Sequence, residues 1–236
     1  AIGAAAFAAS KQTEPLKLAK HFFLGPKFTR NQYVEACKGH REKPVWEILD
    51  DPHAKAVELL KAGEVIGWFR GRMEFGARAL GNRSILADPS QPGIAQRINK
   101  LVKFRESWRP FSASLLESAA DDYIDRGKLN SHDEAMALSV KTTAKFREAY
   151  PDVVHVDGTA RLQVVRDDNN ADFHNLLSQF ADATGQRLLI NTALNRPGEA
   201  LVCTPEEAIN AFHGTDLNYL ILGDLLVSKR EEVDDW

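Results

Sequence analysis

The sequence lacks the features expected of a membrane-spanning, secreted or zinc-stabilised protein. Its 236 residues include only two cysteines, Cys37 and Cys203, which are too few for a disulfide framework and too far apart for a zinc motif. No run of 18 apolar residues occurs, so we expect no transmembrane helix. The apolar first ten residues lack a preceding basic stretch, which disfavours a signal peptide. We therefore expect a cytoplasmic protein without a tightly bound metal.

Charge is distributed unevenly along the chain, although the formal net charge is only −3. Between Arg70 and Arg109, nine basic residues stand against three acidic ones, so this segment carries +6 and the rest of the chain carries −9. A cationic segment on an acidic chain indicates a localised anionic ligand and not a long polyanion. A domain that binds nucleic acid is usually basic overall, so this balance disfavours that function.

Apolar periodicity predicts strands that alternate with helices. Asp51 and Pro52 are typical of a helix start, and Thr204, Pro205 and Glu207 are typical of a capping box. We expect helices at 53–63, 94–102, 142–150, 172–185 and 204–214, and strands at 64–69, 111–117, 136–140, 153–157, 160–165 and 187–191. Residues 219–229 are expected to form a final strand or a pair of strands. This alternation predicts an α/β fold, with a mixed sheet flanked by helices.

The first fifty residues do not follow this pattern. Residues 1–10 are rich in alanine and predict the end of a helix, and a short helix is expected at NQYVEACK. We interpret residues 11–50 as a linker or an irregular lead-in and place a domain boundary between residues 50 and 51. Because the chain begins with Ala1 and not with methionine, we expect it to be part of a longer protein.

The segment GRMEFGARALGNRSILADP (residues 71–89) combines three glycines with Arg72, Arg78, Asn82 and Arg83 after a predicted strand. Glycine lets backbone N–H groups approach a ligand, and the arginine fork matches phosphate or carboxylate oxygens. The segment matches neither the P-loop nor the GxGxxG fingerprint. A phosphate cradle of another type and a glycine-rich surface loop with solvated arginines both remain open.

A basic and aromatic segment follows in NKLVKFRESWRPF, residues 99–111. Its cations and aromatic side chains are Lys103, Arg105, Arg109, Phe104, Trp108 and Phe111. Such a mixture can bind phosphates while it stacks on a nucleobase. In the alternative interpretation, the aromatic residues belong to the core and the cations reach outward to water.

The segment HVDGTARLQVV, residues 155–165, places chemically active side chains close together. On a strand, His155 and Asp157 would share one face, and Arg161 would share a face with Gln163, while the chain would turn at Gly158 and Thr159. An acid–base pair and a hydrogen-bonded structural histidine are both open. Two candidate ligands do not make a metal site.

Polar residues also end the apolar strand in LLINTALNRPGEALV, residues 188–202. Asn191, Thr192 and Asn195 follow the predicted strand, and Pro197 and Gly198 predict a turn. The carboxyl ends of strands are where α/β sheets bind ligands, so Asn191 and Asn195 are candidate binding residues.

These four segments, in this order and over about residues 54–226, resemble the carboxyl-terminal, YrdC-like domain of the NodU/CmcH/TobZ carbamoyltransferase family. The resemblance implies that the domain uses ATP, accompanied by Mg²⁺, to convert carbamoyl phosphate into carbamoyl adenylate. The carbamoyl group would then pass to a hydroxyl of an acceptor sugar or natural product. The lead-in resembles the end of the family's kinase-like domain, whose histidine-bound metal has no matching motif here. That domain and a second copy of the chain are expected partners.

Within the matched segments, the resemblance and the residue types suggest two sets of roles. We expect Arg78, Lys103 and Arg105 to be catalytic. We expect substrate binding by Arg72, Arg83, Asn82, Arg109, His155, Asp157, Thr159, Arg161, Asn191, Thr192 and Asn195. The chain departs from the family pattern at Ala77, and it reads NTALN where the family usually reads NTSFN. The rival hypothesis is a non-catalytic nucleotide- or RNA-binding module with the same fold.

Overall fold

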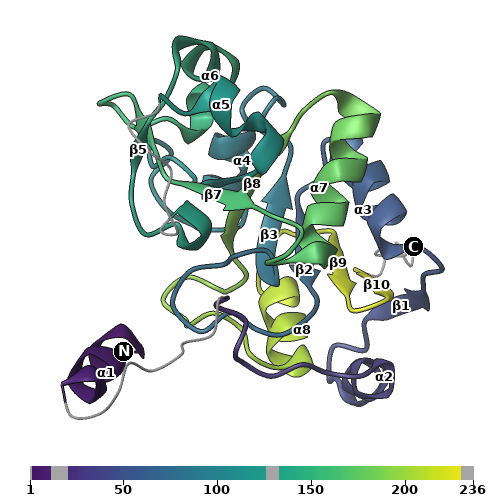
Figure 1. Cartoon of the computed structure of the whole chain (residues 1–236). Helices are drawn as coiled ribbons and strands as arrows, with labels where there is room; N and C mark the ends of the chain where they lie inside the picture. Colours follow the sequence, from purple (N-terminus) through teal and green to yellow (C-terminus); the bar gives the residue numbers. More distant parts are fainter. Residues whose placement is uncertain (1, 12–20, 126–132, 230–236) are drawn as a thin grey trace.

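The computed structural model describes residues 2–11, 21–125 and 133–229 (Figure 1). The helices in these residues are α1 (Ile2–Ser10), α2 (Arg30–Gly39), α3 (Pro52–Lys61), α4 (Ile94–Leu101), α5 (Ala120–Tyr123), α6 (Ala144–Ala149), α7 (Ala171–Thr184) and α8 (Pro205–His213). The strands are β1 (Val45–Ile48), β2 (Ile66–Phe69), β3 (Arg83–Ala87), β4 (Ala113–Leu116), β5 (Val140–Lys141), β6 (Thr159–Ala160), β7 (Leu162–Val165), β8 (Leu188–Ala193), β9 (Tyr219–Leu222) and β10 (Leu225–Ser228). None of these helices is both long and apolar enough to cross a membrane.

An eight-stranded mixed sheet organises the molecule, in the order β1-β10-β9-β2-β3-β8-β4-β7. The pairs β2–β9 and β4–β7 are parallel, and the other neighbours are antiparallel. β5 and β6 form a separate two-stranded sheet. The expected mixed α/β fold is therefore confirmed.

Helices cover both faces of the large sheet. α3 and α7 pack on one face, where Trp68 and Phe180 are fully buried, and the two helices lie side by side in Figure 1. α2, α4 and α8 contribute to the core on the other face, which includes Ile98 and Phe212. Alternate residues of each buried strand face opposite cores, which explains why the strands read as nearly continuous apolar runs.

The caps predicted from the sequence are formed. The Asp51 carboxylate accepts hydrogen bonds from the backbone N–H groups of His53 and Ala54 at the start of α3. Thr204 and Glu207 form the predicted capping box at the start of α8. Gly185 ends α7 in the left-handed conformation, as its position predicted.

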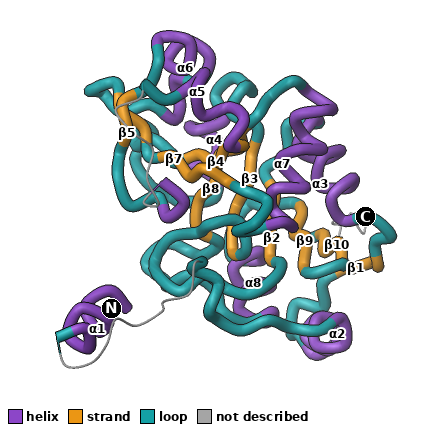
Figure 2. Tube along the Cα trace, viewed as in Figure 1, coloured by secondary structure: helices purple, strands orange, loops and turns teal. Residues whose placement is uncertain are grey.

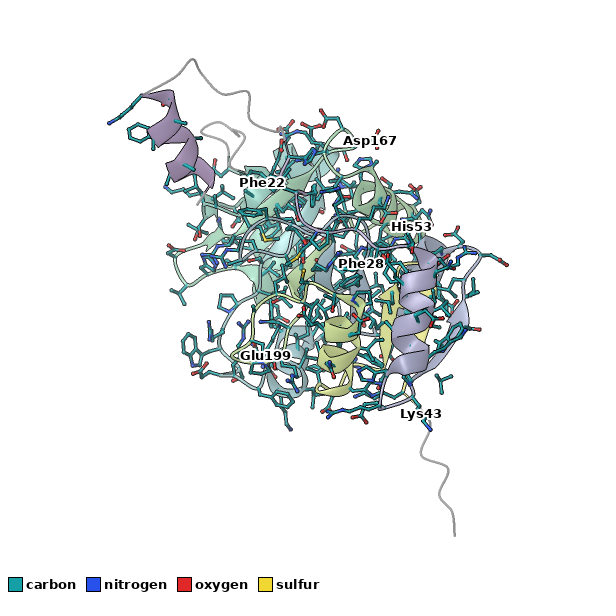
Figure 3. All side chains as sticks on the ribbon, turned by 90° about the horizontal axis from the view of Figure 1, so that it is seen from below. Phe22, Phe28, Lys43, His53, Asp167 and Glu199 are labelled. Carbon is teal, nitrogen blue, oxygen red and sulfur yellow. The ribbon has the colours of Figure 1, made fainter. Side chains whose placement is uncertain are left out.

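The short helix expected at NQYVEACK forms as α2, but residues 30–48 as a whole belong to the packed fold and are not an irregular lead-in. β1 pairs with β10 over four residues, and Tyr33 on α2 is 5% exposed within the core. The boundary between residues 50 and 51 therefore does not mark the start of the packed unit. α1, by contrast, stands apart from the sheet in two views (Figures 1 and 3), and its Phe7 is 64% exposed.

Three strand predictions need correction. Residues 83–87, which belong to the predicted phosphate cradle, form the central strand β3. Residues 153–157 end a short 3-10 helix and enter a turn instead of forming a strand. Of residues 136–140, only the last belongs to a strand, β5. A short apolar run occurs both in strands and in buried turns, and the sequence does not show which strand it would pair with.

Candidate functional site

Four strand ends meet at one edge of the sheet and form the candidate site. β8 is antiparallel to β3 and β4, and β4 is parallel to β7, so the end of β8 lies beside the beginnings of the other three strands. Figure 2 shows that the chain between β2 and β3 is a loop, and its Leu80 carbonyl accepts a hydrogen bond from Gln163 on β7. The segment after α4 reaches the same edge through Lys103, which donates to the Ala193 carbonyl.

Asn191, Ser114 and Gln163 form a buried polar cluster at this edge, on the face of the sheet that α7 covers. Asn191 is 1% exposed, and its Nδ2 lies 2.9 Å from Ser114 Oγ and 3.3 Å from Gln163 Oε1. The Ser114 hydroxyl donates to Gln163 Oε1 at 2.6 Å. Asn191 Oδ1 has no hydrogen-bond partner in the structure. Asn191 was predicted, but Ser114 was missed; a polar residue within the apolar run ASLL was its only signal.

Two arginines, Arg78 and Arg161, lie near this cluster, and neither forms an ion pair with a carboxylate in the part of the chain that the structure describes. Arg78 is exposed overall, but its guanidinium is partly desolvated, and this is the main cause of its lowered pKa. Repulsion from the neighbouring Arg161 lowers the pKa of Arg78 further. Arg161 directly precedes β7, and its Nε is buried without a hydrogen-bond partner. Two neighbouring guanidinium groups repel each other, so their proximity indicates a place where an anion would be stabilised.

Lys103 is a buried cation on the other side of the β8 end. Its side chain is hydrogen-bonded to the Ala193 carbonyl and, at 2.9 Å, to Asn195 Oδ1. Burial is the main cause that lowers the pKa of Lys103 to about 7, and repulsion from the neighbouring Arg105 is the second cause. No carboxylate in the described residues lies within 4 Å of this amine, which sets it apart from an ordinary surface lysine. Thr192, also half-buried at the end of β8, has no described side-chain hydrogen bond.

The basic and aromatic segment divides into buried and exposed parts. Arg105 donates to Asn99 Oδ1 at 2.6 Å and lies over the buried Phe111 ring. Phe104 and Trp108 are 56% and 77% exposed, so the core interpretation fails for both. Phe104 also has a φ of 44°, in the left-handed region. The sixth member, Arg109, is exposed and forms an ion pair with Glu106 at 3.9 Å.

The other predicted residues of the glycine-rich loop hold the loop together. Arg83 is fully buried, and its guanidinium donates to the carbonyls of Arg70, Gly71, Asn82 and Pro26. Carbonyls occupy both terminal nitrogens of the Arg83 guanidinium, whereas its buried Nε has no hydrogen-bond partner, so this conformation does not support the predicted phosphate contact of Arg83.

Glu74, one of the three acidic residues within the cationic segment, is the organising residue of this loop. Its Oε1 accepts from the backbone N–H groups of Leu80, Asn82 and Arg83 at 2.7, 2.8 and 3.2 Å. The Asn82 side chain is also held within the protein, since it donates to the Arg72 carbonyl and accepts from Asn170. Arg72 itself donates to the carbonyls of residues 23 and 24. Arg72 and Arg78 are both exposed, but the Arg72 guanidinium is bound to these carbonyls, whereas no hydrogen bond or ion pair of Arg78 is found within the described residues.

His155, Asp157 and Thr159 form a self-contained turn and not the expected strand face. Asp157 Oδ1 accepts from the Thr159 backbone N–H at 3.0 Å and from its hydroxyl at 2.7 Å. His155 Nδ1 lies 3.0 Å from the same hydroxyl. The hydrogen bond from the Thr159 hydroxyl contributes most, followed by that from its backbone N–H, and together they lower the pKa of Asp157. The structural interpretation of His155 therefore describes this segment.

A separate groove of about 1000 Å³ lies between α2, α8 and residues 196–203. Its walls carry carboxylates, among them Glu35, Glu199 and Glu206, together with Arg41 and Arg196. Figure 3 shows Glu199 on the loop beside α8, where it forms an ion pair with Arg196. The mixture of charges makes this groove a poorer anion site than the β8 edge, and no sequence motif predicted it.

Comparisons with known proteins agree with the motifs at the β8 edge. Residues 57–229 match the family model described as "Carbamoyltransferase C-terminus". The chain is 37% identical over 243 residues to nodulation protein NolNO of Sinorhizobium fredii, which covers 100% of this chain and 35% of that protein. It is 33% identical over 180 residues to the 3'-hydroxymethylcephem-O-carbamoyltransferase of Streptomyces clavuligerus, which covers 76% of this chain and 33% of that protein.

The fold is also found in a solved structure of low sequence similarity. HypF of T. kodakarensis superposes with a TM-score of 0.51 at 15% identity, over 80% of this chain and 24% of that one. The chain thus spans about a third of the curated relatives named above. The match over most of its length shows that the chain belongs to the carbamoyltransferase family and corresponds to the carboxyl-terminal domain of its members.

Proposed function

We propose that this domain binds ATP and carbamoyl phosphate and forms carbamoyl adenylate. We further propose that, in proteins with the length of the curated relatives, the carbamoyl group then passes to a hydroxyl of an acceptor. One relative is named for O-carbamoyl transfer to a hydroxymethyl group, which supports a hydroxyl acceptor.

The observation that carries the proposal is a set of four cations at the β8 edge: Arg78, Arg161, Lys103 and Arg105. In the described part of the chain, none of the four has a carboxylate within 4 Å. Burial lowers the pKa of Lys103 and Arg105, so an anion that enters the site would favour the charged form of both groups. Amide groups of Asn191 and Asn195 accompany these cations and suit a neutral carbamoyl group.

The proposed chemistry brings together two anionic substrates. Carbamoyl phosphate, ATP and one water give carbamoyl adenylate, phosphate and pyrophosphate, in which a carbamate oxygen bonds to the α-phosphorus as pyrophosphate leaves. Cations are needed to offset repulsion between the substrates, and their fixed positions supply proximity. Mg²⁺ would enter with the ATP phosphates.

Exchange of labelled pyrophosphate into ATP tests the proposal, and it should depend on carbamoyl phosphate. Arg78→Ala and Arg161→Ala should each lower the exchange rate by about tenfold or more, because each removes a charged contact to a substrate. Arg97→Ala is the matched control. Arg97 is an exposed arginine on α4, and it already forms an ion pair with Glu64. Exchange without carbamoyl phosphate, or none at all, would contradict the proposed reaction.

Thermal-shift measurements separate this proposal from the rival nucleic-acid module. ATP with carbamoyl phosphate should raise the melting temperature more than an oligoribonucleotide at equal concentration. The opposite order would favour the rival, although the chain's net charge of −3 argues against it.

A further inference from the structure

A chain of buried hydrogen bonds begins at the carbonyl oxygen of Leu80. Gln163 Nε2 donates to this carbonyl at 2.9 Å, and Gln163 is 3% exposed. A carbonyl oxygen can only accept, so the amide nitrogen of Gln163 must face Leu80. The Gln163 oxygen, Oε1, must therefore face the opposite side, toward Ser114.

The next two links fix the direction of the chain. Ser114 donates its one hydroxyl proton to Gln163 Oε1 at 2.6 Å. The Ser114 oxygen is then available as an acceptor, and Asn191 Nδ2 lies 2.9 Å away. Asn191 Nδ2 also lies 3.3 Å from Gln163 Oε1 and from the Ala79 carbonyl, which are both acceptors. The orientation of the Asn191 amide is therefore determined by its neighbours.

This orientation leaves Asn191 Oδ1 as a buried acceptor without a donor. Asn191 is 1% exposed, so this oxygen is shielded from bulk solvent. Arg161 Nε is a buried donor that also has no partner. Asn191 and Arg161 flank Ser112, because the Asn191 N–H donates to the Ser112 carbonyl and the Arg161 carbonyl accepts from Ala113. The unpaired acceptor of Asn191 on β8 and the unpaired donor of Arg161, just before β7, thus lie on either side of β4.

We propose that Asn191 Oδ1 accepts a hydrogen bond from the NH₂ of the carbamoyl group, and that Ser114 and Gln163 are positioning residues that keep this oxygen turned toward the substrate. The inference rests on the proposed function and adds a specificity determinant to it. An acetyl group has the same shape but a methyl group in place of the NH₂, so it leaves Oδ1 unpaired. Exposed residues 75–78 directly precede the Ala79 and Leu80 carbonyls that contact Asn191 and Gln163.

Isothermal titration of the wild-type chain with carbamoyl phosphate, acetyl phosphate and inorganic phosphate tests the inference without a folding risk. Carbamoyl phosphate should bind about tenfold or more tightly than acetyl phosphate, because only the first supplies an N–H donor to the buried oxygen. Equal affinities would overturn the inference while leaving phosphate recognition intact. Failure of carbamoyl phosphate to bind at all would overturn the proposed function as well.

Three variants then locate the source of the preference. Asn191→Leu removes the acceptor, whereas Gln163→Met and Ser114→Ala remove the groups that orient it. Each should reduce the preference for carbamoyl over acetyl phosphate to less than about threefold, with the affinity for inorganic phosphate changed less than about twofold.

A matched control separates this role from general destabilisation. Thr215→Val removes another buried hydroxyl, which bonds only within the end of α8, and should keep the wild-type preference. If Gln163→Met and Ser114→Ala fold, bind phosphate and retain the full preference, the orienting chain has no role in specificity.

Discussion

Lys103 donates a hydrogen bond to Asn195 Oδ1 at 2.9 Å, although 92 positions separate the two residues in the sequence. Asn195 in turn donates through Nδ2 to the Glu199 carbonyl at 2.8 Å. The loop that follows β8 is therefore fastened at its start to a buried cation. Because neither partner carries a negative charge, the contact holds Lys103 in place without neutralising it.

The first prediction concerns proton uptake at Lys103. Its pKa in the free protein is lowered to about 7 from 10.5, so at about pH 8 most molecules carry the neutral amine. A bound phosphate favours the ammonium, so binding should take up a proton, and affinity should fall as the pH rises above about 7. Titration calorimetry in two buffers of different ionisation enthalpy measures this uptake.

Two variants give the contrast for this prediction. Lys103→Met should abolish proton uptake, whereas Lys100→Met, which alters an exposed lysine on α4, should retain it. Without ligand, the Lys103 shift should make the free energy of unfolding rise between pH 7 and 10.5, because the unfolded chain then binds the proton that the folded chain has lost. A wild-type protein that takes up no proton on binding would show that Lys103 is already charged.

The second prediction assigns Arg83 to stability. Arg83→Leu should lower the free energy of unfolding by about 3 kcal/mol, since it leaves several buried carbonyls without donors. Arg83→Lys should recover only part of this loss, because an ammonium lacks the guanidinium fork. Urea unfolding followed by circular dichroism measures both. A stable Arg83→Leu protein that has lost only phosphate binding would restore the role first expected from the sequence.

The fold was largely predictable wherever local signals were strong. Asp51, Thr204 and Gly185 carry their capping information in neighbouring residues, so the ends of α3, α8 and α7 follow from the sequence. β3 was not predictable in the same way. Its Arg83 resembles a ligand-binding arginine, and only long-range packing against Phe69 and the loop carbonyls makes it a core residue.

The candidate site was predictable in its members but not in their arrangement. Arg78, Lys103 and Asn191 were found because charged and amide groups stand out beside apolar strands. Ser114 was missed because its role exists only where β4 lies between β7 and β8. Likewise, His155 was expected on a strand face, but Gly158 has a φ of 76° and turns the chain back on itself.

The third prediction concerns acid stability. Asp172 on α7 receives two hydrogen bonds of 2.8 Å from Arg70 and lies 3.1 Å from His53 Nε2. Despite the opposing effect of burial, hydrogen bonds from Arg70 and His53 hold the pKa of Asp172 well below its usual range. The carboxylate therefore stabilises the fold above its unfolded pKa of about 3.9, and this stabilisation is lost as the pH falls toward the folded value.

Asp172→Asn should lower the free energy of unfolding at pH 7 by about 1–3 kcal/mol, a range reduced for the partial exposure of the pair. The difference from the wild type should shrink as the pH falls from about 5 toward about 2. Asp182→Asn, at an exposed position on the same helix, is the control and should change little. A constant difference across this pH range would mean that charge does not cause the loss.

The last prediction concerns the start of the packed unit. A chain cut to residues 51–236 loses β1 and α2, although the family model itself begins at residue 57. The shortened chain would lose the Tyr33 ring, which packs closely on Gly223. A Cβ added to Gly223 would lie only 2.1 Å from Tyr33 Cε2. Loss of the buried Tyr33, Ala36 and Cys37 side chains should cost several kcal/mol, at about 25 cal/mol per Å² of apolar surface, and β10 becomes an exposed edge. We expect this chain to melt at least about 10 °C lower or to aggregate, whereas a chain that begins at residue 21 should melt close to the full chain. Equal melting temperatures for the 51–236 and 21–236 chains would place the boundary at Asp51 after all.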